Sequence, residues 1–533
     1  MTAPFVLQRT VFPPEGETAA RALYVDGPGE IAGRETLHVA GGGTVSLGTY
    51  FNSFAAAYWR RYAALGRVVL TVDAAGRGTI DVVASDAHAR PAVVGRIPID
   101  GSGERRVELD LARFDDGGAI WLDLRSVDGL ELRSARWTTD AAPRRGGAVT
   151  VVIATFNRPD DCAAQLRAVG GDPALVASLA GVVVVDQGDA HPDDADGFAA
   201  ASALLGDRLR IVRQPNLGGS GGYSRGMLEA LAAGDSDAVL LLDDDARAEP
   251  EAIARAIAFF RYAAREVVVG GGMLHIDAPT RLYAQSEQWD DRISWFALGR
   301  DGAYDVDFAE TPWRGHENLH RVERSDFNGW WMCLLPTAVL RRVGLAQPLF
   351  LKGDDVEFGL RAGAAGVETV SLPGVAVWHL GWGSKLPTHT WEAYFLHRNR
   401  LITALLHSTG RYGRLTVLHA FLGDLKLLSR GHTAPVALRA RATRDAVAGP
   451  GALPGWLATR VVTVRAAMTA MTDAASRRSP AGTAVAVIGA AAASAARHAR
   501  LLLGWPRLAA RFRASAGDAT SVAAWRRIIE DAT

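Results

Sequence analysis

Three consecutive aspartates, Asp243, Asp244 and Asp245, carry the clearest chemical signal in this sequence. They end an apolar run in the segment LLLDDDARAEP (240–250). Because side chains alternate along a strand, Asp243 and Asp245 should point to one side and Asp244 to the other. Two carboxylates on one side of a strand end suit a hard divalent cation, which takes oxygen ligands and bridges phosphates. A solvated acidic turn is the alternative, but the apolar strand before the aspartates favours a metal site.

Two further segments could bind or activate a substrate. The Gly-rich segment NLGGSGGYSRGM (216–227) opens a predicted helix, and backbone N–H groups at a helix start attract phosphate or carboxylate. Its spacing fits neither a dinucleotide fingerprint nor a Walker loop. The segment FLKGDDVEFGLRA (350–362) places Asp354 and Asp355 just before an amphipathic helix. Such a carboxylate can act as a general base, or it can simply favour the helix N-terminus.

Aromatic and imidazole side chains complete the set of candidates. Trp330 and Trp331 lie in FNGWWMCLLP (327–336), where aromatic rings either stack on sugar faces or fill a core. His379 ends another apolar run, AVWHLGWGS (376–384). An imidazole there can complete a metal shell or have a purely structural role.

The elements that must position these residues form an α/β pattern. Continuous apolar runs, typical of buried parallel strands, occur at 148–157, 181–189, 208–216 and 237–245. Helical stretches lie between them. Polar residues gather where the runs end, including Asn157, Arg158, Asp186, Gln187 and Asn216. Because ligands bind at the carboxyl ends of strands in open α/β sheets, we expect a ligand crevice at that edge.

The flanking segments have a different character. Residues 1–145 contain short alternating runs with Gly- and Asp-rich turns, for instance two strands around a turn at 74–78, and predict a β-sandwich or small barrel. After about residue 392 the pattern is helical and rich in Ala, Leu and Arg. We therefore predict three domains: an N-terminal β-sandwich domain at 1–145, an α/β catalytic domain at 146–392 and a helical, basic domain at 393–533.

The composition is that of a globular protein and excludes a disordered chain, a collagen-like rod or a disulfide scaffold. The chain has 533 residues, of which 48% are hydrophobic and 22% charged. Its only cysteines, Cys162 and Cys333, fit a reducing compartment. Residues 1–10 have no basic segment followed by an apolar stretch, so we expect no secretory signal.

The zero net charge hides an asymmetry. Residues 398–515 contain 18 Lys and Arg against 3 Asp, whereas residues 1–397 carry an excess of acidic side chains. A basic helical region suggests contact with an anionic membrane surface or with nucleic acid, or pairing with the acidic body across domains or subunits. Few aromatic side chains are available to stack on bases, so nucleic acid is not expected. The longest uncharged window there, 479–496, contains Pro480, Gly482, Thr483 and Gly489 and is otherwise mostly alanine, which argues against a membrane-spanning helix.

Together the motifs resemble inverting glycosyltransferases of family 2 with the GT-A fold, and among them the actinobacterial galactofuranosyltransferases that polymerise galactan from UDP-galactofuranose. The resemblance runs from about Thr49 to Arg400. It covers TYFNSFAAAYWRR (49–61), TFNRPDDC (155–162), DQGD (186–189), QPNLGGSGGYSRGM (214–227), DDDARAEP (243–250), DFNGWW (326–331), DDVEFGLRA (354–362) and VWHLGW (377–382). It implies a GT-A core with a Rossmann-like parallel or mixed sheet.

The resemblance also implies a role for each candidate position. The donor nucleotide sugar would be held by Arg158, Gln187, Asn216, Asp243, Asp244 and Lys352. Mn²⁺ or Mg²⁺ would be bound by Asp243, Asp245 and His379. Asp355 would be the catalytic base that deprotonates the acceptor hydroxyl. Acceptor contacts would come from Trp330, Trp331, Asp354 and His397.

Two departures from the family pattern bear on the acceptor site. Gly353 stands where the family tends to have Trp, and YFLHRN (394–399) replaces YFH-x-RN, which displaces His397 by one residue. The acceptor sugar can therefore differ. A family-2 transferase for another nucleotide sugar, such as rhamnose, and a non-catalytic polysaccharide-binding protein are the alternatives to a galactofuranosyltransferase.

The same resemblance implies where the protein works. Its acceptor would be a lipid-linked galactan, so we expect a cytoplasmic, peripheral protein on the inner face of the cell membrane, forming a homo-oligomer. The basic region could lie on anionic lipid. Its apolar side chains beside Arg507, Arg511 and Arg513 could insert shallowly, as interfacial helices do; these are Leu501, Leu502, Leu503 and Trp505.

Overall fold

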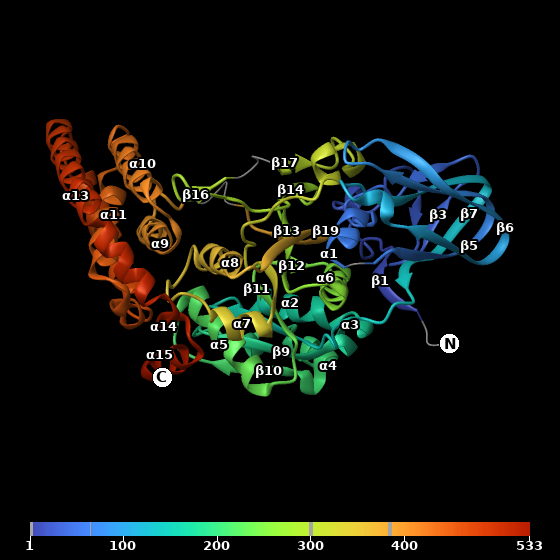
Figure 1. Cartoon of the computed structure of the whole chain (residues 1–533), viewed down its shortest axis with the longest axis horizontal. Coiled ribbons are helices and arrows are strands. Elements are labelled where there is room, and N and C mark those ends of the chain that lie inside the picture. Colours follow the sequence, from blue (N-terminus) through green and yellow to red (C-terminus); the bar gives the residue numbers. More distant parts are fainter. Residues whose placement is uncertain (1–3, 64, 298–301, 382–385) are drawn as a thin grey trace.

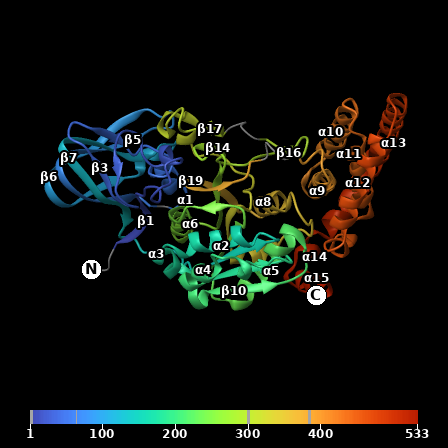
Figure 2. The same ribbon diagram turned by 180° about the vertical axis from the view of Figure 1, so that it is seen from behind.

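Three regions of different architecture follow one another along the chain. The computed structural model describes residues 4–63, 65–297, 302–381 and 386–533. Figure 1 shows long strands at one end, a layered α/β region in the middle and a group of helices at the other end, and Figure 2 shows the same arrangement from behind. The predicted boundary at 145/146 falls between strands β7 and β8, and the one at 392/393 falls at the start of helix α9.

The N-terminal region is a seven-stranded sheet in the order β2-β3-β7-β5-β6, with β1 and β4 also paired to β7. The strands are β1 (Phe5–Arg9), β2 (Glu30–Ile31), β3 (Leu37–Val39), β4 (Thr44–Ser46), β5 (Arg67–Ser85), β6 (Pro91–Asp110) and β7 (Ile120–Thr139), and the helix is α1 (Ala56–Tyr62). All pairs are antiparallel. The alternating sequence pattern thus builds one sheet with a buried face.

The predicted turn at 74–78 is wrong, because β5 runs through it without interruption. The pairing of β5 with β7 shifts register at Asp73/Ala74 and at Arg77/Gly78. A Cβ atom on Gly76 would lie 2.1 Å from the carbonyl oxygen of Gly129. The glycines therefore allow two strands to approach and bend, and a bulge of this kind has the same sequence signature as a turn.

The middle region is a mixed sheet of ten strands in the order β10-β9-β8-β11-β18-β13-β14-β17, with β19 paired to β13 and to β12. Its strands are β8 (Val149–Thr155), β9 (Leu179–Asp186), β10 (Leu209–Arg213), β11 (Ala238–Asp243), β12 (Arg247–Ala248), β13 (Val267–His275), β14 (Arg281–Ala284), β17 (Tyr304–Asp307), β18 (Met332–Pro336) and β19 (Glu368–His379), and β15 (Trp289–Asp290) pairs separately with β16 (Trp295–Phe296). Strands β8 to β11 are parallel, as predicted. The GT-A-like α/β core is confirmed.

Helices cover both faces of this sheet. They are α2 (Pro159–Gly170), α3 (Pro173–Ser178), α4 (Phe198–Leu205), α5 (Gly218–Ala233), α6 (Pro250–Tyr262), α7 (Thr337–Val343) and α8 (Asp354–Ala364). Alternate residues of β8 belong to two separate cores: Val151 packs with side chains of α2 and α6, whereas Val152 packs with side chains of α5, α7 and α8. Burial on both faces explains why these strands read as continuous apolar runs.

The C-terminal region is helical. Its helices are α9 (Glu392–His407), α10 (Arg411–Leu428), α11 (Thr433–Ala448), α12 (Arg460–Ser476), α13 (Pro480–Ala514), α14 (Ala516–Thr520) and α15 (Val522–Ala532). Helix α15 returns to the α/β region, where Trp525 Nε1 donates to the carbonyl oxygen of Ala346 at 2.8 Å. Among the described residues, no helix has an apolar stretch sufficient to cross a bilayer.

Two of the four apolar side chains that we expected to insert into lipid are buried. Leu501 and Trp505 are each 4% exposed and pack with Val417 and Phe512. Only Leu503 is largely exposed, at 85%. The expectation was wrong for Leu501 and Trp505, because apolar periodicity marks a helix face that becomes buried without indicating whether protein or lipid covers it.

A buried arginine joins the N-terminal sheet to the α/β region. Arg255 on α6 is 2% exposed, and its Nε donates to Glu251 Oε1 at 3.1 Å. Its other nitrogens donate to the carbonyl oxygens of Phe51, Gly374 and Arg9 at 2.5, 3.1 and 2.7 Å. A buried charge is tolerated only when its hydrogen bonds are satisfied, so these contacts fix the N-terminal sheet against α6 and β19.

Candidate active site

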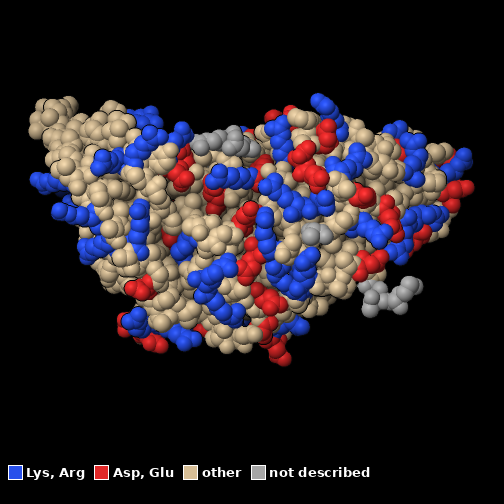
Figure 3. All heavy atoms as spheres, in the orientation of Figure 1, with Lys and Arg blue, Asp and Glu red and all other residues tan. Residues whose placement is uncertain are grey.

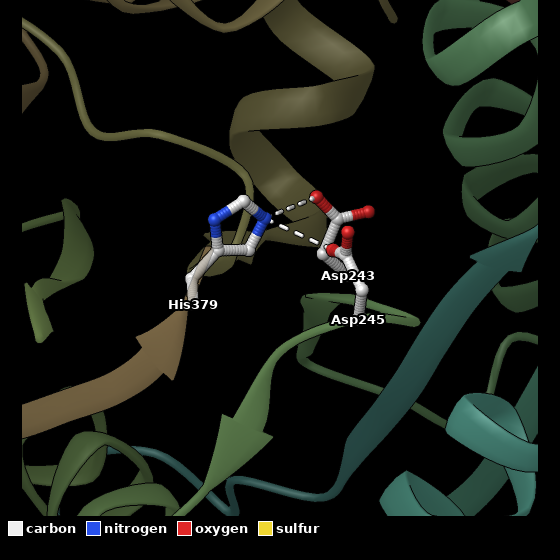
Figure 4. A group of neighbouring side chains, drawn as sticks. All are labelled: Asp243, Asp245 and His379. Carbon is white, nitrogen blue, oxygen red and sulfur yellow. Dashed lines mark ion pairs between the residues drawn. The ribbon is translucent and has the colours of Figure 1, made fainter. Parts of the chain in front are cut away.

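Two strand ends bring three metal-ligating side chains together. Asp243 ends β11, Asp245 follows two residues later, and His379 ends β19. His379 Nε2 lies 2.9 Å from Asp245 Oδ1 and 3.4 Å from Asp243 Oδ2, as Figure 4 shows. One ligand atom from each residue lies within 4.8 Å of the other two. The two aspartates thus share one side, as their spacing predicts.

The electrostatics of this cluster favour a positive charge at its centre. Burial disfavours the charged imidazolium, but hydrogen bonds and the charges of Asp243 and Asp245 outweigh that cost and raise the pKa of His379 to about 10. Asp244 is not part of the cluster; its Oδ2 accepts from the N–H of Phe156 at 3.4 Å, and the residue is 7% exposed. Burial and the charge of Asp243 raise its pKa. The carboxylate oxygens of this set suit Mn²⁺ or Mg²⁺. The imidazole nitrogen suits Mn²⁺ better than Mg²⁺.

A buried glutamine, which the sequence did not single out, braces the aspartate loop. Gln165 on α2 is 1% exposed. Its Nε2 donates to the carbonyl oxygen of Asp243 at 3.2 Å, and its Oε1 accepts from the backbone N–H of Ala248 at 3.3 Å. The same loop is tied to β19, because β12 pairs with Val377 and Trp378 just before His379. A lone Gln within an ordinary helix carries no sequence signal for this role.

A cavity of about 240 Å³ lies at the carboxyl ends of the parallel strands, and we call it the strand-end cavity. Its lining includes Arg158, Gln187, Asn216, Asp243 and Asp244. The sequence-predicted donor residues, Lys352 excepted, therefore come together on this side. Arg158 also pairs with Asp161 at 2.8 Å and with Asp245 at 3.4 Å.

Gln187 and Asn216 shape the Gly-rich segment that closes the strand-end cavity. Gln187 Nε2 donates to the carbonyl oxygen of Gly218, and Gln187 Oε1 accepts from the N–H of Leu217 at 3.0 Å. Asn216 Oδ1 accepts from the N–H of Gly218 at 2.9 Å. Gly218 has φ +71°, and a Cβ there would lie 2.1 Å from the carbonyl oxygen of Phe350. Only glycine fits at the start of α5.

A second cavity, of about 360 Å³, adjoins the first, and we call it the aromatic cavity. Its lining includes Tyr283, Glu287, Trp295, Phe296, Trp330, Trp331, Lys352, Asp354, Asp355, His379 and Leu396. Asp243 and Tyr223 line both cavities. Tyr223 Oη donates to Asp243 Oδ1 at 3.2 Å. The metal-ligating cluster therefore stands where the two cavities meet.

Two acids at the start of α8 face the aromatic cavity. Asp354 is 7% exposed, and Asp355 Oδ1 accepts from the N–H of Val356 at 2.7 Å. Burial raises the pKa of both carboxyls. At Asp354 the charge of Asp355 raises the pKa further. At Asp355 the hydrogen bond from the N–H of Val356 and the charge of Lys352 limit the rise. A carboxylate with a raised pKa is a stronger base than a free aspartate.

The aromatic cavity holds a further acid that sequence reasoning missed. Glu287 is 6% exposed and accepts from the N–H of Gly329 at 2.6 Å. Burial and the charge of Asp355 raise its pKa well above the ordinary value.

Trp330 and Trp331 are 5% and 8% exposed, so most of each ring is buried in the core.

His397 does not reach the aromatic cavity, and its neighbour Leu396 lines the cavity instead. His397 is 2% exposed, and its Nε2 lies 3.0 Å from Thr443 Oγ1 on α11. The one-residue displacement noted in the sequence turns the imidazole by one helical position, about 100°, into the helical region. The motif at 377–382 ends in Trp382, which lies outside the described residues.

Comparison with known proteins assigns a family to this chain. Residues 7–140 match the family described as Galactofuranosyltransferase 2 N-terminal, and residues 143–404 match Glycosyltransferase like family 2. Galactofuranosyltransferase GlfT2 of Mycolicibacterium smegmatis is 41% identical over 462 residues, which cover 84% of this chain and 71% of that protein. GlfT2 of Mycobacterium tuberculosis is 38% identical over 463 residues, with coverage of 84% and 72%.

The similarity to solved structures is low. The mannosyltransferase PcManGT from Pyrobaculum calidifontis, in complex with GDP-Man and Mn²⁺, is 17% identical, covers 67% of this chain and 88% of its own, and has a TM-score of 0.33. GalNAc-T7 with UDP, GalNAc and Mn²⁺ is 15% identical, with coverage of 54% and 56% and a TM-score of 0.36. Neither likeness adds to the description of the site.

The mixed sheet, the family matches and the paired cavities define a glycosyltransferase. The chain belongs to the GlfT2 family of galactofuranosyltransferases. This membership confirms the resemblance drawn from the motifs, and it excludes the alternative of a non-catalytic polysaccharide-binding protein.

Proposed function

We propose that this glycosyltransferase moves galactofuranose from UDP-galactofuranose to a growing lipid-linked galactan of the cell wall, with inversion and with the help of Mn²⁺ or Mg²⁺. One observation carries the proposal: the strand-end cavity and the aromatic cavity meet at Asp243. A donor in the first and an acceptor in the second would bring their reacting atoms together beside the metal-ligating cluster. The names of the GlfT2 relatives support the choice of sugar.

Asp243, Asp245 and His379 would hold the divalent cation. When bound, such a cation neutralises the charge that develops on a leaving diphosphate. Arg158, Gln187, Asn216 and Asp244 would hold the uridine and its phosphates in the strand-end cavity. Lys352 lines the aromatic cavity, from which its ammonium group would approach the donor sugar.

Asp355 would be the base. Its carboxylate takes the proton of the acceptor hydroxyl while that oxygen attacks the anomeric carbon, and the bond from this carbon to the diphosphate oxygen breaks as UDP leaves with the electron pair. Attack from the face opposite the leaving group inverts the anomeric centre without a covalent intermediate, as in other inverting displacements. Trp330 and Trp331 would contact the sugar through their exposed edges, with Asp354 as a hydrogen-bond partner.

The first prediction concerns donor and metal together. Purified protein given UDP-galactofuranose, a synthetic galactofuranosyl acceptor and Mn²⁺ should extend the acceptor by galactofuranose, as measured by mass spectrometry, and EDTA should abolish extension. Asp245→Asn should lower turnover at least about 10²-fold, because it removes charge from the cluster. Asp128→Asn, an exposed aspartate of the N-terminal sheet, is the control. Full activity in EDTA contradicts metal dependence, and preference for another nucleotide sugar contradicts the donor.

The second prediction concerns the base. Asp355→Asn should bind UDP as the wild type does and lose at least about 10²-fold in transfer rate. Because burial raises the pKa of Asp355 above its ordinary value of 3.8, wild-type kcat should fall as the pH drops through a value above that of a free aspartate, since the protonated carboxyl cannot accept a proton. Near-normal turnover of Asp355→Asn, together with a loss of turnover in Asp354→Asn, would show that Asp354 and not Asp355 is the base.

We also propose that the protein lies on the inner face of the cell membrane through its C-terminal helices, and that it acts as a homo-oligomer. In Figure 3 this end of the molecule, at the left, carries many basic and few acidic side chains. One face of α10 exposes Leu415, Leu418 and Leu422 by 39, 47 and 53%, next to exposed Arg414 and Lys426. A leucine stripe flanked by cations suits the interface of an anionic leaflet.

Vesicle flotation tests the membrane proposal. The wild type should float with vesicles containing anionic lipid at low salt and less at high salt, because surface charges are screened. The double substitution Leu418→Asp and Leu422→Asp should weaken flotation. Leu204→Asp is the matched control, since Leu204 on α4 is 48% exposed. Absence of wild-type binding at low salt, or equal binding of both variants, refutes this surface; sedimentation of the same samples reports the oligomeric state.

A further inference from the structure

The segment HRNR (397–400) of helix α9 follows Leu396, which lines the aromatic cavity. All four side chains are buried, with exposures between 1 and 7%. Three of them donate hydrogen bonds to main-chain carbonyl oxygens of two segments, 345–353 and 290–297. The first segment leads directly into α8 and its acids, and the second carries the aromatic wall of the cavity.

The turn before α8 has a backbone that needs outside support. Phe350, Lys352 and Gly353 have φ angles of +72, +67 and +90°. The left-handed region is unfavourable for residues with a Cβ atom, so two of these three positions are strained. Strained backbone persists only where surrounding groups hold it. The orientation of Lys352, Asp354 and Asp355 depends on that hold.

Asn399 provides hydrogen bonds along the whole turn. Its Nδ2 donates to the carbonyl oxygens of Leu349, Leu351 and Lys352 at 3.2, 2.8 and 2.7 Å. Its Oδ1 accepts from Nε of Arg398 at 2.9 Å. Because the arginine can only donate, the amide oxygen must face Arg398 and the amide nitrogen must face the turn.

Contacts of the neighbouring residues hold α9 and the turn in place around Asn399. Arg400 donates to the carbonyl oxygens of Ile293 and Ser294 at 2.5 and 2.9 Å, and its guanidinium lies 4.9 Å from the ring centre of Trp295. From the opposite side, the N–H of Phe350 donates to Ser220 Oγ on α5 at 2.9 Å. The turn is thus held between α5 and α9.

We infer that Asn399 is a positioning residue, which keeps the turn 349–353 in the conformation that directs Asp355 into the aromatic cavity. The inference rests on the proposed role of Asp355 as base. A base must lie within hydrogen-bond reach of the proton it takes, and a displacement of about 1 Å can cost about 10²-fold in rate. Asn399 touches neither donor nor acceptor cavity, so its effect passes through the turn.

Three substitutions test the inference in the full-length protein. Asn399→Leu removes both polar atoms, and Asn399→Asp keeps the shape but puts an acceptor opposite three carbonyl oxygens. Asn52→Leu is the matched control: Asn52 is 2% exposed and donates from Nδ2 to the carbonyl oxygens of Val11 and Tyr24 at 2.8 and 2.7 Å, within the N-terminal region. The measurements are kcat and KM for transfer, UDP affinity, and hydrogen exchange of peptide 345–356.

We expect both Asn399 variants to lose about 10²-fold in kcat while UDP affinity stays within about threefold, since the turn acts on the reacting hydroxyl and UDP is held mainly from the strand-end cavity. Peptide 345–356 should exchange faster in both. Asn52→Leu should keep wild-type kcat. If Asn399→Leu does not fold, Asn399→Asp alone decides.

Three results would overturn the inference: wild-type kcat in Asn399→Asp, unchanged exchange of peptide 345–356, or an equal loss of kcat in Asn52→Leu. The first would assign the effect to packing volume alone, and the last to general stability. Asp355→Asn is assayed in parallel. If Asp355→Asn keeps its turnover, the proposed base fails. If Asp355→Asn is inactive and Asn399→Asp is fully active, only the positioning role fails.

Discussion

Carboxylates crowd around the point where β11 and β19 end, and their mutual repulsion is the constraint on which the site depends. Asp243, Asp245, Asp354, Asp355 and Glu287 all lie at or beside the aromatic cavity. Like charges in a buried setting raise each other's pKa or attract a cation. The raised pKa of His379 reflects this attraction to Asp243 and Asp245. In the proposed function, the negative diphosphate of the donor would enter this place together with a cation that offsets its charge.

The rest of the structure holds these charges at fixed separations. Gln165 and strand β12 keep the aspartate loop against β19. Arg255 anchors β19 to the N-terminal sheet through Gly374. On the opposite side, Asn399 supports the turn that carries Asp355. Sheet, N-terminal region and helical region therefore each contribute one support to a site that none of them could form alone.

Periodic sequence patterns predicted the strands, whereas side-chain contacts between distant parts of the chain could not be predicted. The apolar runs around 148–157 and 237–245 identified parallel strands because burial on both faces leaves an unmistakable composition. The pairing of Asp243 with Asp245 followed from strand alternation. Nothing local distinguished the bend at Gly76 from a turn, because both need glycine. Gln165 and Asn399 were missed, and His397 was misplaced, because their partners lie far along the chain and only the tertiary fold brings them together.

Anomalous diffraction from crystals grown with UDP and Mn²⁺ tests the central claim most directly, since it locates the cation independently of activity. The account predicts one manganese peak between the carboxylates of Asp243 and Asp245 and Nε2 of His379, next to the phosphates of UDP. UDP bound in the strand-end cavity with no peak at these three residues, or manganese bound elsewhere, would contradict it.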